Sequence, residues 1–239
     1  MNTLTGLCVE AAAPYRAGGR YARHFARGKL GGDPAFAALL RLGLLPDDAR
    51  VLDLGCGQAL LASWLHTAAA RHARGLWPAD WPPPPRPGPY HGIELMMQDV
   101  HRAEAALAPL GKAVQVIRGD VRTTPFPASD VVVILDVLHY IDHAAQAEVL
   151  DRARAALAPA GTLLLRVGDA DAGLPFRISV WVDRLVTRLH GHRLGTLHCR
   201  TLAEWRRQLE QRGFTVQALP MSAGTPFANV LLVARLAGD

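Results

Sequence analysis

Apolar and polar positions follow two regular patterns along the chain, and together they predict strands that alternate with helices. Apolar or β-branched runs of strand length occur at residues 50–54, 90–95, 113–120, 129–136, 162–167, 214–220 and 227–236. Apolar residues recur at helical spacing over 58–72, 97–108, 143–158, 176–189 and 201–213. No helical pattern separates the last two strands, so we expect them to form an antiparallel pair.

This order of elements predicts an α/β fold. We expect a doubly wound, mostly parallel seven-stranded sheet with helices on both faces and a terminal antiparallel hairpin, which is a Rossmann-like arrangement. Ligands of such sheets lie at the carboxyl ends of the strands. The residues that carry chemistry are therefore expected just after the strands.

Composition shifts suggest how the chain is organised. Residues 14–45 are predicted to be helical, with a break at glycines and a helix start at Asp33-Pro34. We therefore expect an N-terminal helical cap over 1–46 and a main domain over 47–239, with a Pro-rich insertion at 75–89 and a helical insertion at 170–200. The Pro-rich stretch is either a tolerated surface insertion or a lid or docking loop anchored by Trp77 and Trp81.

Composition and charge narrow the class of protein. The chain has 239 residues, of which 50% are hydrophobic, so one sizeable core is expected and disorder is not. The net charge of +5 is only weak evidence for acidic partners, since an arginine- and alanine-rich compositional bias explains it better. Cys8, Cys56 and Cys199 fit no metal spacing and suggest a reducing, cytoplasmic location. Neither a signal peptide nor a membrane-spanning run is recognisable.

Acidic residues end four successive predicted strands, at Asp53, Glu94, Asp120 and Asp136. A single acid after a strand is most often a helix cap or a solvated turn. Four of them at one sheet edge, with the turn Gly55-Cys56-Gly57 after the first strand, predict a ligand that approaches the backbone closely.

Two nucleotide motifs are excluded by this turn. A dinucleotide fingerprint needs a third glycine where the chain has Leu60, and a phosphate-binding loop needs a Gly-Lys-Ser/Thr sequence that is missing. The glycines of the turn allow a ligand to approach the backbone closely, but the sequence does not identify that ligand as a phosphate group.

The segments "LDLGCGQALL", "HGIELM", "RGDV" and "DVVVILDVLHYI" resemble, in order, the motifs of class I S-adenosylmethionine-dependent methyltransferases. The resemblance extends over roughly residues 48–236. It implies that the turn at Gly55, Cys56 and Gly57 lines the methionine part of the cofactor and that Asp53 holds its amino end. It also implies the remaining contacts: Glu94 with the ribose hydroxyls, Leu95, Asp120 and Val121 with the adenine, and Asp136 near the methyl donor.

Four further residues are candidates for the site. His139 is a candidate general base, or else a packing residue, and Tyr140 could shape the pocket. In the family that the chain resembles, N-terminal helices often cover the cofactor. Tyr21 could then face the sulfonium and Lys29 could pair with the cofactor carboxylate, unless the segment is an ordinary basic amphipathic helix.

The acceptor is expected to be a small or acyl-carrier-linked organic molecule. The chain lacks the Asp-Pro-Pro-aromatic and Pro-Cys motifs of DNA-modifying relatives after its fourth strand. It is similar to methyltransferases found with bacterial aryl-polyene pigment synthesis, which implies a phenolic or aromatic substrate and an acidic carrier protein. Acceptor specificity is expected within residues 174–200, and no metal site is predicted. An RNA methyltransferase, a nicotinamide-type oxidoreductase and a non-catalytic binding module remain as alternatives.

Overall fold

The computed structural model describes residues 3–170, 197–222 and 228–237, which form two compact units over Met1–Val131 and Val132–Asp239. The predicted helix at 176–189 and most of the predicted insertion at 170–200 lie outside the described residues. The boundary predicted at residue 46 stays a prediction, since the two units divide within the fourth strand. The described α-helices are α1 (Thr3–Ala12), α2 (Arg20–Gly32), α3 (Pro34–Arg41), α4 (Leu60–Ala73), α5 (Met97–Leu107), α6 (His143–Ala156) and α8 (Leu202–Glu210).

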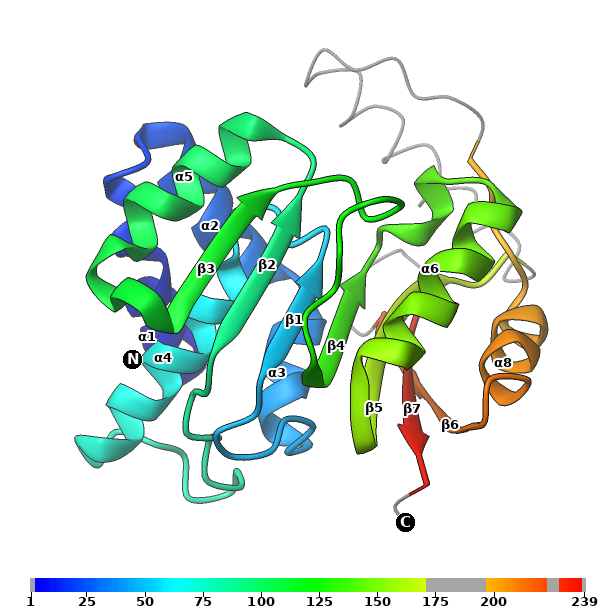
Figure 1. Ribbon diagram of the computed structural model, residues 1–239. Coiled ribbons are helices and arrows are strands. Elements are labelled where there is room, and N and C mark those ends of the chain that lie inside the picture. The colour runs from blue at the N-terminus through cyan, green and yellow to red at the C-terminus, as the bar shows by residue number, and fades with distance from the viewer. Residues whose placement is uncertain (1–2, 171–196, 223–227, 238–239) are drawn as a thin grey trace. The chain divides into compact units, whose positions relative to one another are not determined.

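Seven strands pair in the order β3-β2-β1-β4-β5-β7-β6 (Figure 1). They are β1 (Val51–Leu54), β2 (Tyr90–Glu94), β3 (Val114–Arg118), β4 (Ser129–Leu135), β5 (Leu157–Gly168), β6 (Phe214–Pro220) and β7 (Asn229–Leu236). Strands β1, β2 and β3 are parallel, whereas β7 is antiparallel to both β5 and β6. The predicted doubly wound sheet with its terminal hairpin is confirmed.

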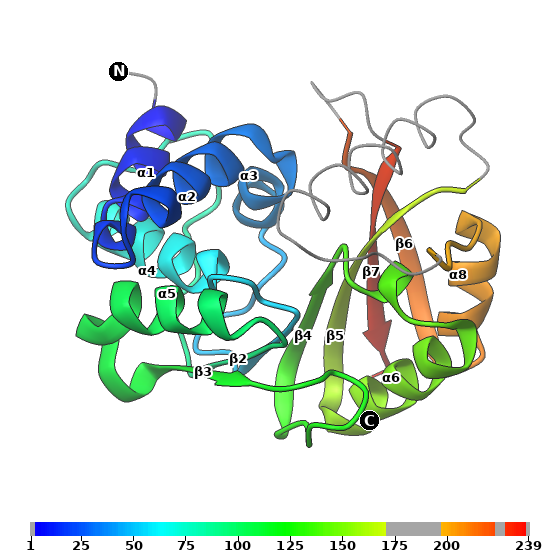
Figure 2. The same cartoon turned by 90° about the horizontal axis from the view of Figure 1, so that it is seen from above.

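In the first unit, α4 and α5 cover one face of β1, β2 and β3 (Figure 2). Every residue of β1 is buried, as its apolar run predicts, and this includes the acid Asp53. Because these three strands are parallel, their carboxyl ends lie at the same edge. The residues that follow β1, β2 and β3 are therefore brought together by the topology.

The helix starts predicted from capping residues are confirmed. The Asp33 carboxylate accepts a hydrogen bond from the Ala35 amide at 3.0 Å, and Asp142 accepts one from Ala145 at 2.9 Å. Thr201 and Glu204 form the reciprocal capping box at the start of α8.

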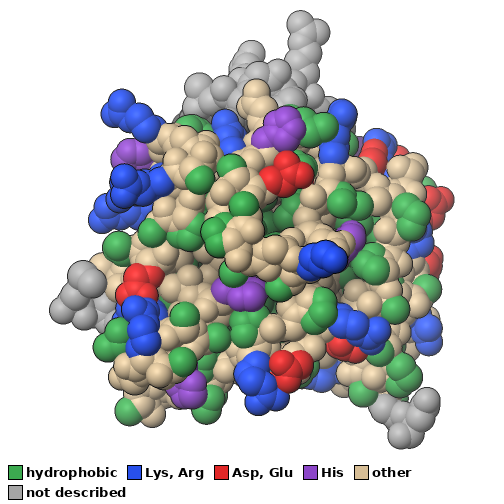
Figure 3. Space-filling view, turned by 60° about the vertical axis from the view of Figure 1, so that its left-hand side comes forward, with side chains coloured by type: hydrophobic (Ala, Val, Ile, Leu, Met, Phe, Trp, Pro, Cys, Tyr) green, Lys and Arg blue, Asp and Glu red, His purple; other side chains and the backbone are tan. Residues whose placement is uncertain are grey.

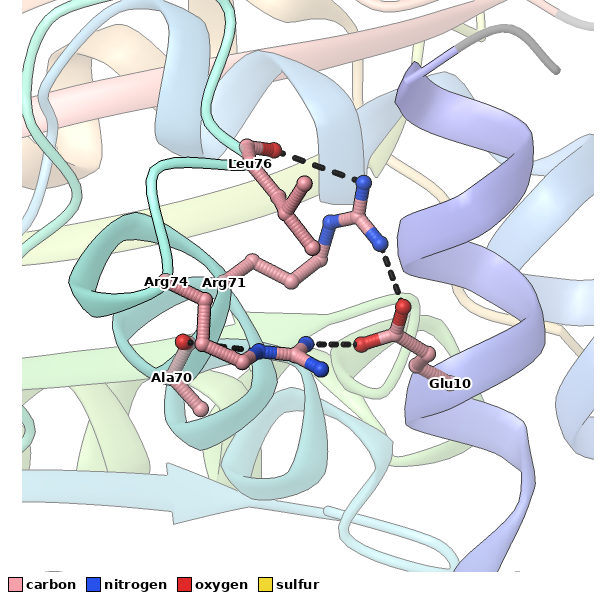
Figure 4. A network of polar contacts seen from close by, with 5 residues as sticks. All are labelled: Glu10, Ala70, Arg71, Arg74 and Leu76. Atoms are coloured by element: carbon pink, nitrogen blue, oxygen red, sulfur yellow. Dashed lines mark hydrogen bonds and ion pairs between the residues drawn. The ribbon is translucent and has the colours of Figure 1, made fainter.

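Helix α1 was not among the predicted elements. It packs against α2 and α4 and buries Leu7, Cys8 and Ala11. Its Glu10 carboxylate binds the guanidinium groups of Arg71 and Arg74 on α4 (Figure 4). These ion pairs hold the N-terminal helix to the helix that follows the glycine turn.

The Pro-rich segment closes onto the amino ends of the strands. The Val51 amide donates to the Pro89 carbonyl at 2.8 Å, just before β2 begins. The segment is held by the Trp77 indole, which donates to the Pro82 carbonyl at 2.9 Å, and by Arg86, which pairs with Asp48 at 2.7 Å. Since parallel strands present their carboxyl ends at the opposite edge, a lid over the glycine turn is not compatible with this position.

The second unit is built on the antiparallel strands β5, β7 and β6, with α6 packed on β5 and α8 on β6. Its core contains Leu163–Leu165 and Leu231–Ala234, all fully buried. Strand β5 begins at Leu157, directly after α6 ends and five residues earlier than the predicted start. None of the helices within the described residues is long and apolar enough to cross a membrane.

We expect Glu10→Gln to lower the free energy of unfolding by about 1 kcal/mol, because it leaves the largely buried Arg71 guanidinium without its anionic partner. Urea unfolding followed by circular dichroism measures this change. The matched control is Glu104→Gln on the exposed surface of α5, which should change stability by less than about 0.5 kcal/mol. Equal effects of the two substitutions would contradict a stabilising role for this ion pair.

Candidate functional site

The turn after β1 has a backbone that is open to a ligand. Gly55 and Gly57 have positive φ angles of 72° and 55°, a conformation that side chains disfavour. A Cβ atom placed on Gly57 would meet no other atom within 4 Å. The amides of Gly55 and Cys56 both donate to the Ile93 carbonyl, at 2.8 and 3.2 Å, which fixes the turn against the end of β2.

Ala59 occupies the third small position of the turn, just before α4. Its φ angle of 52° is also left-handed, which costs an alanine roughly 1–2 kcal/mol relative to the right-handed conformation. Its side chain is fully buried. The alanine is therefore a strained substitute for the glycine that this conformation prefers, and the turn keeps its shape despite it.

Glu94 joins the end of β2 to the glycine turn. One carboxylate oxygen accepts from the Gly57 amide and the other from the Met96 amide, both at 2.8 Å. Burial raises the pKa of Glu94, and these amide hydrogen bonds oppose that rise. A carboxylate has about four acceptor positions, so Glu94 can accept further hydrogen bonds from ligand hydroxyls.

Asp53 is buried beside the turn. The Tyr90 hydroxyl donates to one oxygen of its carboxylate. The pKa of Asp53 is raised to about 7, because burial raises it by more than the Tyr90 hydrogen bond lowers it and the negative charge of Glu94 adds to the rise. A cationic ligand beside this carboxylate would stabilise its ionised form.

The N-terminal segment holds the far side of the turn. The Tyr15 hydroxyl donates to the Gln58 carbonyl at 2.9 Å, and the Gln58 side chain donates to Asp99 on α5 at 3.2 Å. Arg102 pairs with Asp99 at 2.9 Å and lies 4.5 Å from the centre of the Tyr21 ring. Tyr21 is therefore placed against α5, and its predicted contact with the sulfonium stays a prediction.

The predicted adenine contacts lie after β2 and β3. Leu95 is 56% exposed, and Val121 is buried. The Gly119 amide donates to the Glu94 carbonyl at 2.9 Å, which brings the loop after β3 to the end of β2. The Asp120 carboxylate pairs with Arg122 at 2.6 Å, a partner that the sequence interpretation did not include.

Lys29 has an intramolecular partner that the sequence interpretation did not include. Its ammonium group lies 2.8 Å from the Asp33 carboxylate, one helical turn further along the chain. Its predicted pairing with a cofactor carboxylate stays a prediction, and it would compete with this contact.

In the second unit, the candidate residues follow β4. Asp136 has a left-handed φ of 59°, and its carboxylate pairs with Arg166, whose side chain is 1% exposed. The ring centres of His139 and Tyr140 lie 4.1 Å apart. The buried Gln146 side chain donates to the carbonyls of Leu138 and Ile141, at 3.0 and 3.1 Å, and so holds the loop that contains these two rings.

Gln146 and Arg166 were not recognised in the sequence, although an arginine within the buried strand "LLLRV" is a readable signal.

The residues around the glycine turn fit S-adenosylmethionine. The open space at Gly57 admits a ligand against the backbone, Glu94 retains acceptor positions for a ribose, and Asp53 suits a cationic amino group. Leu95 offers an exposed apolar surface for a flat base. Within the described residues, no group of His, Cys, Asp and Glu side chains is arranged to hold a metal ion.

Comparison with known families assigns the chain to a protein family. A family model described as a methyltransferase domain matches residues 22–219, so the chain belongs to the methyltransferase-domain family. The resemblance to S-adenosylmethionine-dependent methyltransferases is thereby confirmed, and with it the class of the cofactor. The match begins within α2, inside the predicted N-terminal cap. A search of curated proteins found no match.

Solved structures share the fold. An O-methyltransferase family protein from Burkholderia thailandensis is 18% identical, with a TM-score of 0.64 over 94% of this chain and 62% of that chain. The pyocyanin biosynthetic protein PhzM is 19% identical, with a TM-score of 0.62 over 93% of this chain and 61% of that chain. Magnesium protoporphyrin IX methyltransferase from Synechocystis PCC 6803, with bound SAH, is 19% identical, with a TM-score of 0.56 over 85% and 80%.

The chain thus spans about three fifths of the length of the first two proteins, at 62% and 61%. At these identities the comparison concerns the fold alone.

We expect Gly92→Ala to lower the free energy of unfolding by about 1–3 kcal/mol, because the added Cβ would lie 2.6 Å from the Cys56 sulfur. Urea unfolding measures the change. Adding Cys56→Ala should recover at least about 1 kcal/mol of that loss, since it removes the sulfur. Gly28→Ala is the control: its Cβ meets nothing within 4 Å, and alanine favours the helix, so stability should stay level or rise. Additive effects of Gly92→Ala and Cys56→Ala would show that the close contact is misplaced.

Proposed function

We propose that the protein transfers the methyl group of S-adenosylmethionine to a small or carrier-bound organic acceptor. The observation that carries this proposal is the Glu94 carboxylate, which binds the Gly57 amide and still has acceptor positions at the edge of an open turn. A glycine turn and a carboxylate held together in this way suit an adenosyl group and its amino acid tail.

The bound cofactor supplies an activated methyl group. The chain therefore has to bind the cofactor and the acceptor, align the acceptor with the methyl group, and exclude water from the site. Asp53 and the turn at Gly55 and Gly57 receive the amino acid part, and Glu94 receives the ribose hydroxyls. Leu95, Asp120 and Val121 receive the adenine. In the second unit, His139 accepts a proton from the acceptor, Tyr140 shapes the pocket, and Asp136 is oriented by Arg166.

The proposed acceptor is a phenolic or aromatic molecule such as an aryl-polyene precursor. The pyocyanin biosynthetic protein and the O-methyltransferase family protein among the structural neighbours support small-molecule chemistry. Cys8 and Cys56 are free thiols, which supports a reducing compartment such as the cytoplasm.

An acidic carrier protein is the proposed partner. Helix α2 exposes Arg20, Arg23 and Arg27, and residues 11–32 contain no acid. Basic side chains also form a group at the upper left of the face viewed in Figure 3. Such a surface favours encounter with an anionic partner. An RNA methyltransferase would use the same charge, so methylation of added RNA by the purified protein would favour that alternative.

Binding of S-adenosylhomocysteine tests the cofactor assignment. We expect calorimetry to detect binding to the wild-type protein and none of NADH. Glu94→Ala should weaken binding about a hundredfold or more, because it removes charge-assisted hydrogen bonds to the ribose. Glu104→Ala is the matched control and should bind as the wild type does. Normal binding by Glu94→Ala would place the ribose elsewhere, and no binding by the wild type would remove the proposed function.

Turnover tests the role of His139. The acceptor is first identified by incubating the protein with methyl-labelled cofactor and an extract of the producing cells. With that acceptor, we expect His139→Ala to keep its affinity for S-adenosylhomocysteine and to lower kcat about a hundredfold or more, as the loss of a general base does. The exposed His101→Ala should leave kcat unchanged. An unchanged kcat in His139→Ala would assign His139 to packing, and the absence of any labelled product would favour a non-catalytic binding module.

A further inference from the structure

Three residues of β2 stand on one face of the strand. Side chains alternate along a strand, so Tyr90, Gly92 and Glu94 point the same way. The register pairs Asp53 of β1 with Gly92, which places the carboxylate between the tyrosine and the glutamate. Tyr90 is 4% exposed and Asp53 is 5% exposed. The sequence "YHGIE" therefore aligns a phenol, an empty position and an acid beside a buried carboxylate.

The empty position at Gly92 makes this arrangement possible. A Cβ atom there would lie 2.6 Å from the Cys56 sulfur and 3.3 Å from a ring carbon of Tyr90. Because the glycine leaves that space, the Tyr90 ring and the Cys56 thiol both fit against the strand. The phenol is thus held in place by packing on its ring, and its hydroxyl donates to the Asp53 carboxylate.

The surroundings of Asp53 lack a positive charge among the described groups that act on it. Apart from burial, the pKa of Asp53 responds to the Tyr90 hydroxyl and to the Glu94 carboxylate. Cys56 is close enough for Asp53 and Glu94 to raise its pKa, and Tyr15 acts on Tyr90 in the same way. Cys56, Tyr90 and Glu94 are therefore the titratable groups that act on this carboxylate or respond to it, and each is neutral or negative.

We propose that Tyr90 is a positioning residue that orients the Asp53 carboxylate and favours its ionised form, so that it can receive the cationic amino group of the cofactor. This inference rests on the proposed function, because it assigns the partner of Asp53 within that site. Tyr90 itself does not need to touch the cofactor. Its hydroxyl donates to one carboxylate oxygen and leaves the other to accept from the ligand.

The sign of the pH effect follows from the charges. The ionised form of Asp53 attracts the amino group, so affinity falls as the pH drops through the pKa of Asp53, which is about 7. The Tyr90 hydrogen bond stabilises the ionised form. Removing it moves the midpoint of the affinity profile to higher pH.

The test is calorimetric titration of S-adenosylhomocysteine between pH 5.5 and 8.5 with the full-length protein. We expect Tyr90→Phe to shift the midpoint upward by about one pH unit, which is about a tenfold loss of affinity at the acidic end and less than about twofold at the alkaline end. Tyr15→Phe is the matched control. It removes another buried phenol hydroxyl, which bonds to the Gln58 carbonyl and not to Asp53, so the midpoint should stay.

A second measurement uses the wild-type protein and keeps the proposal testable if Tyr90→Phe does not fold. Titrations in two buffers of different ionisation enthalpy should show proton release on binding near pH 6.5, and Asp53→Asn should abolish that release. Wild-type protein that binds without releasing a proton, or Tyr90→Phe with an unchanged midpoint, would overturn the role of Tyr90. Wild-type protein that does not bind at all would instead overturn the proposed function.

Discussion

The hydrogen bond between the Gly57 amide and the Glu94 carboxylate is the constraint on which the candidate site depends. It joins the turn after β1 to the end of β2, and backbone hydrogen bonds to the Ile93 and Glu94 carbonyls extend the connection to the loop after β3. The ends of three parallel strands are thus fixed by main-chain hydrogen bonds together with the Glu94 carboxylate. Since a carboxylate has about four acceptor positions, Glu94 can hold the turn and still serve a ligand.

Burial makes the same edge electrostatically unsatisfied. Asp53 and Glu94 are both buried, and their negative charges raise the pKa values of neighbouring acidic groups: Glu94 raises that of Asp53, and both raise that of Cys56. Amide hydrogen bonds offset part of this cost at Glu94, and a phenol hydrogen bond offsets part of it at Asp53. A positively charged ligand removes the remainder. In the proposed function, such a site would gain affinity from these buried negative charges, because the cationic cofactor would act as their counter-ion as well as supplying its methyl group.

Much of the fold was predictable because it follows from local patterns. The buried strands, the acids at their ends and the three capped helix starts all have short sequence signatures, and all were confirmed. Helix α1 was missed although its apolar residues Leu4, Leu7 and Cys8 have the helical spacing i, i+3 and i+4, because the segment is short and its other residues are mostly small. Its place is decided by packing on α4 and by the ion pairs of Glu10, which depend on residues about sixty positions away.

Side-chain partners were less predictable than strand ends. The acids Asp120 and Asp136 were recognised, yet their pairing with Arg122 and Arg166 was not, because the strand pattern alone does not say which arginine an acid meets. The alternation in "YHGIE" places Tyr90, Gly92 and Glu94 on one face of the strand. Identifying Tyr90 as the partner of Asp53 also requires the strand register, which pairs Asp53 with Gly92 and cannot be read from the sequence.

The Pro-rich segment has a consequence for how the chain can vary. It runs from the end of α4 to the start of β2 at the amino edge of the sheet. There Trp77 donates a hydrogen bond to Pro82 and Arg86 pairs with Asp48. Closing a longer loop adds little entropic cost, and an insertion here would start from the edge of the sheet opposite the glycine turn. The exposed residues Ala79 and Asp80 are therefore a suitable site for inserting a reporter domain while leaving the candidate site unchanged.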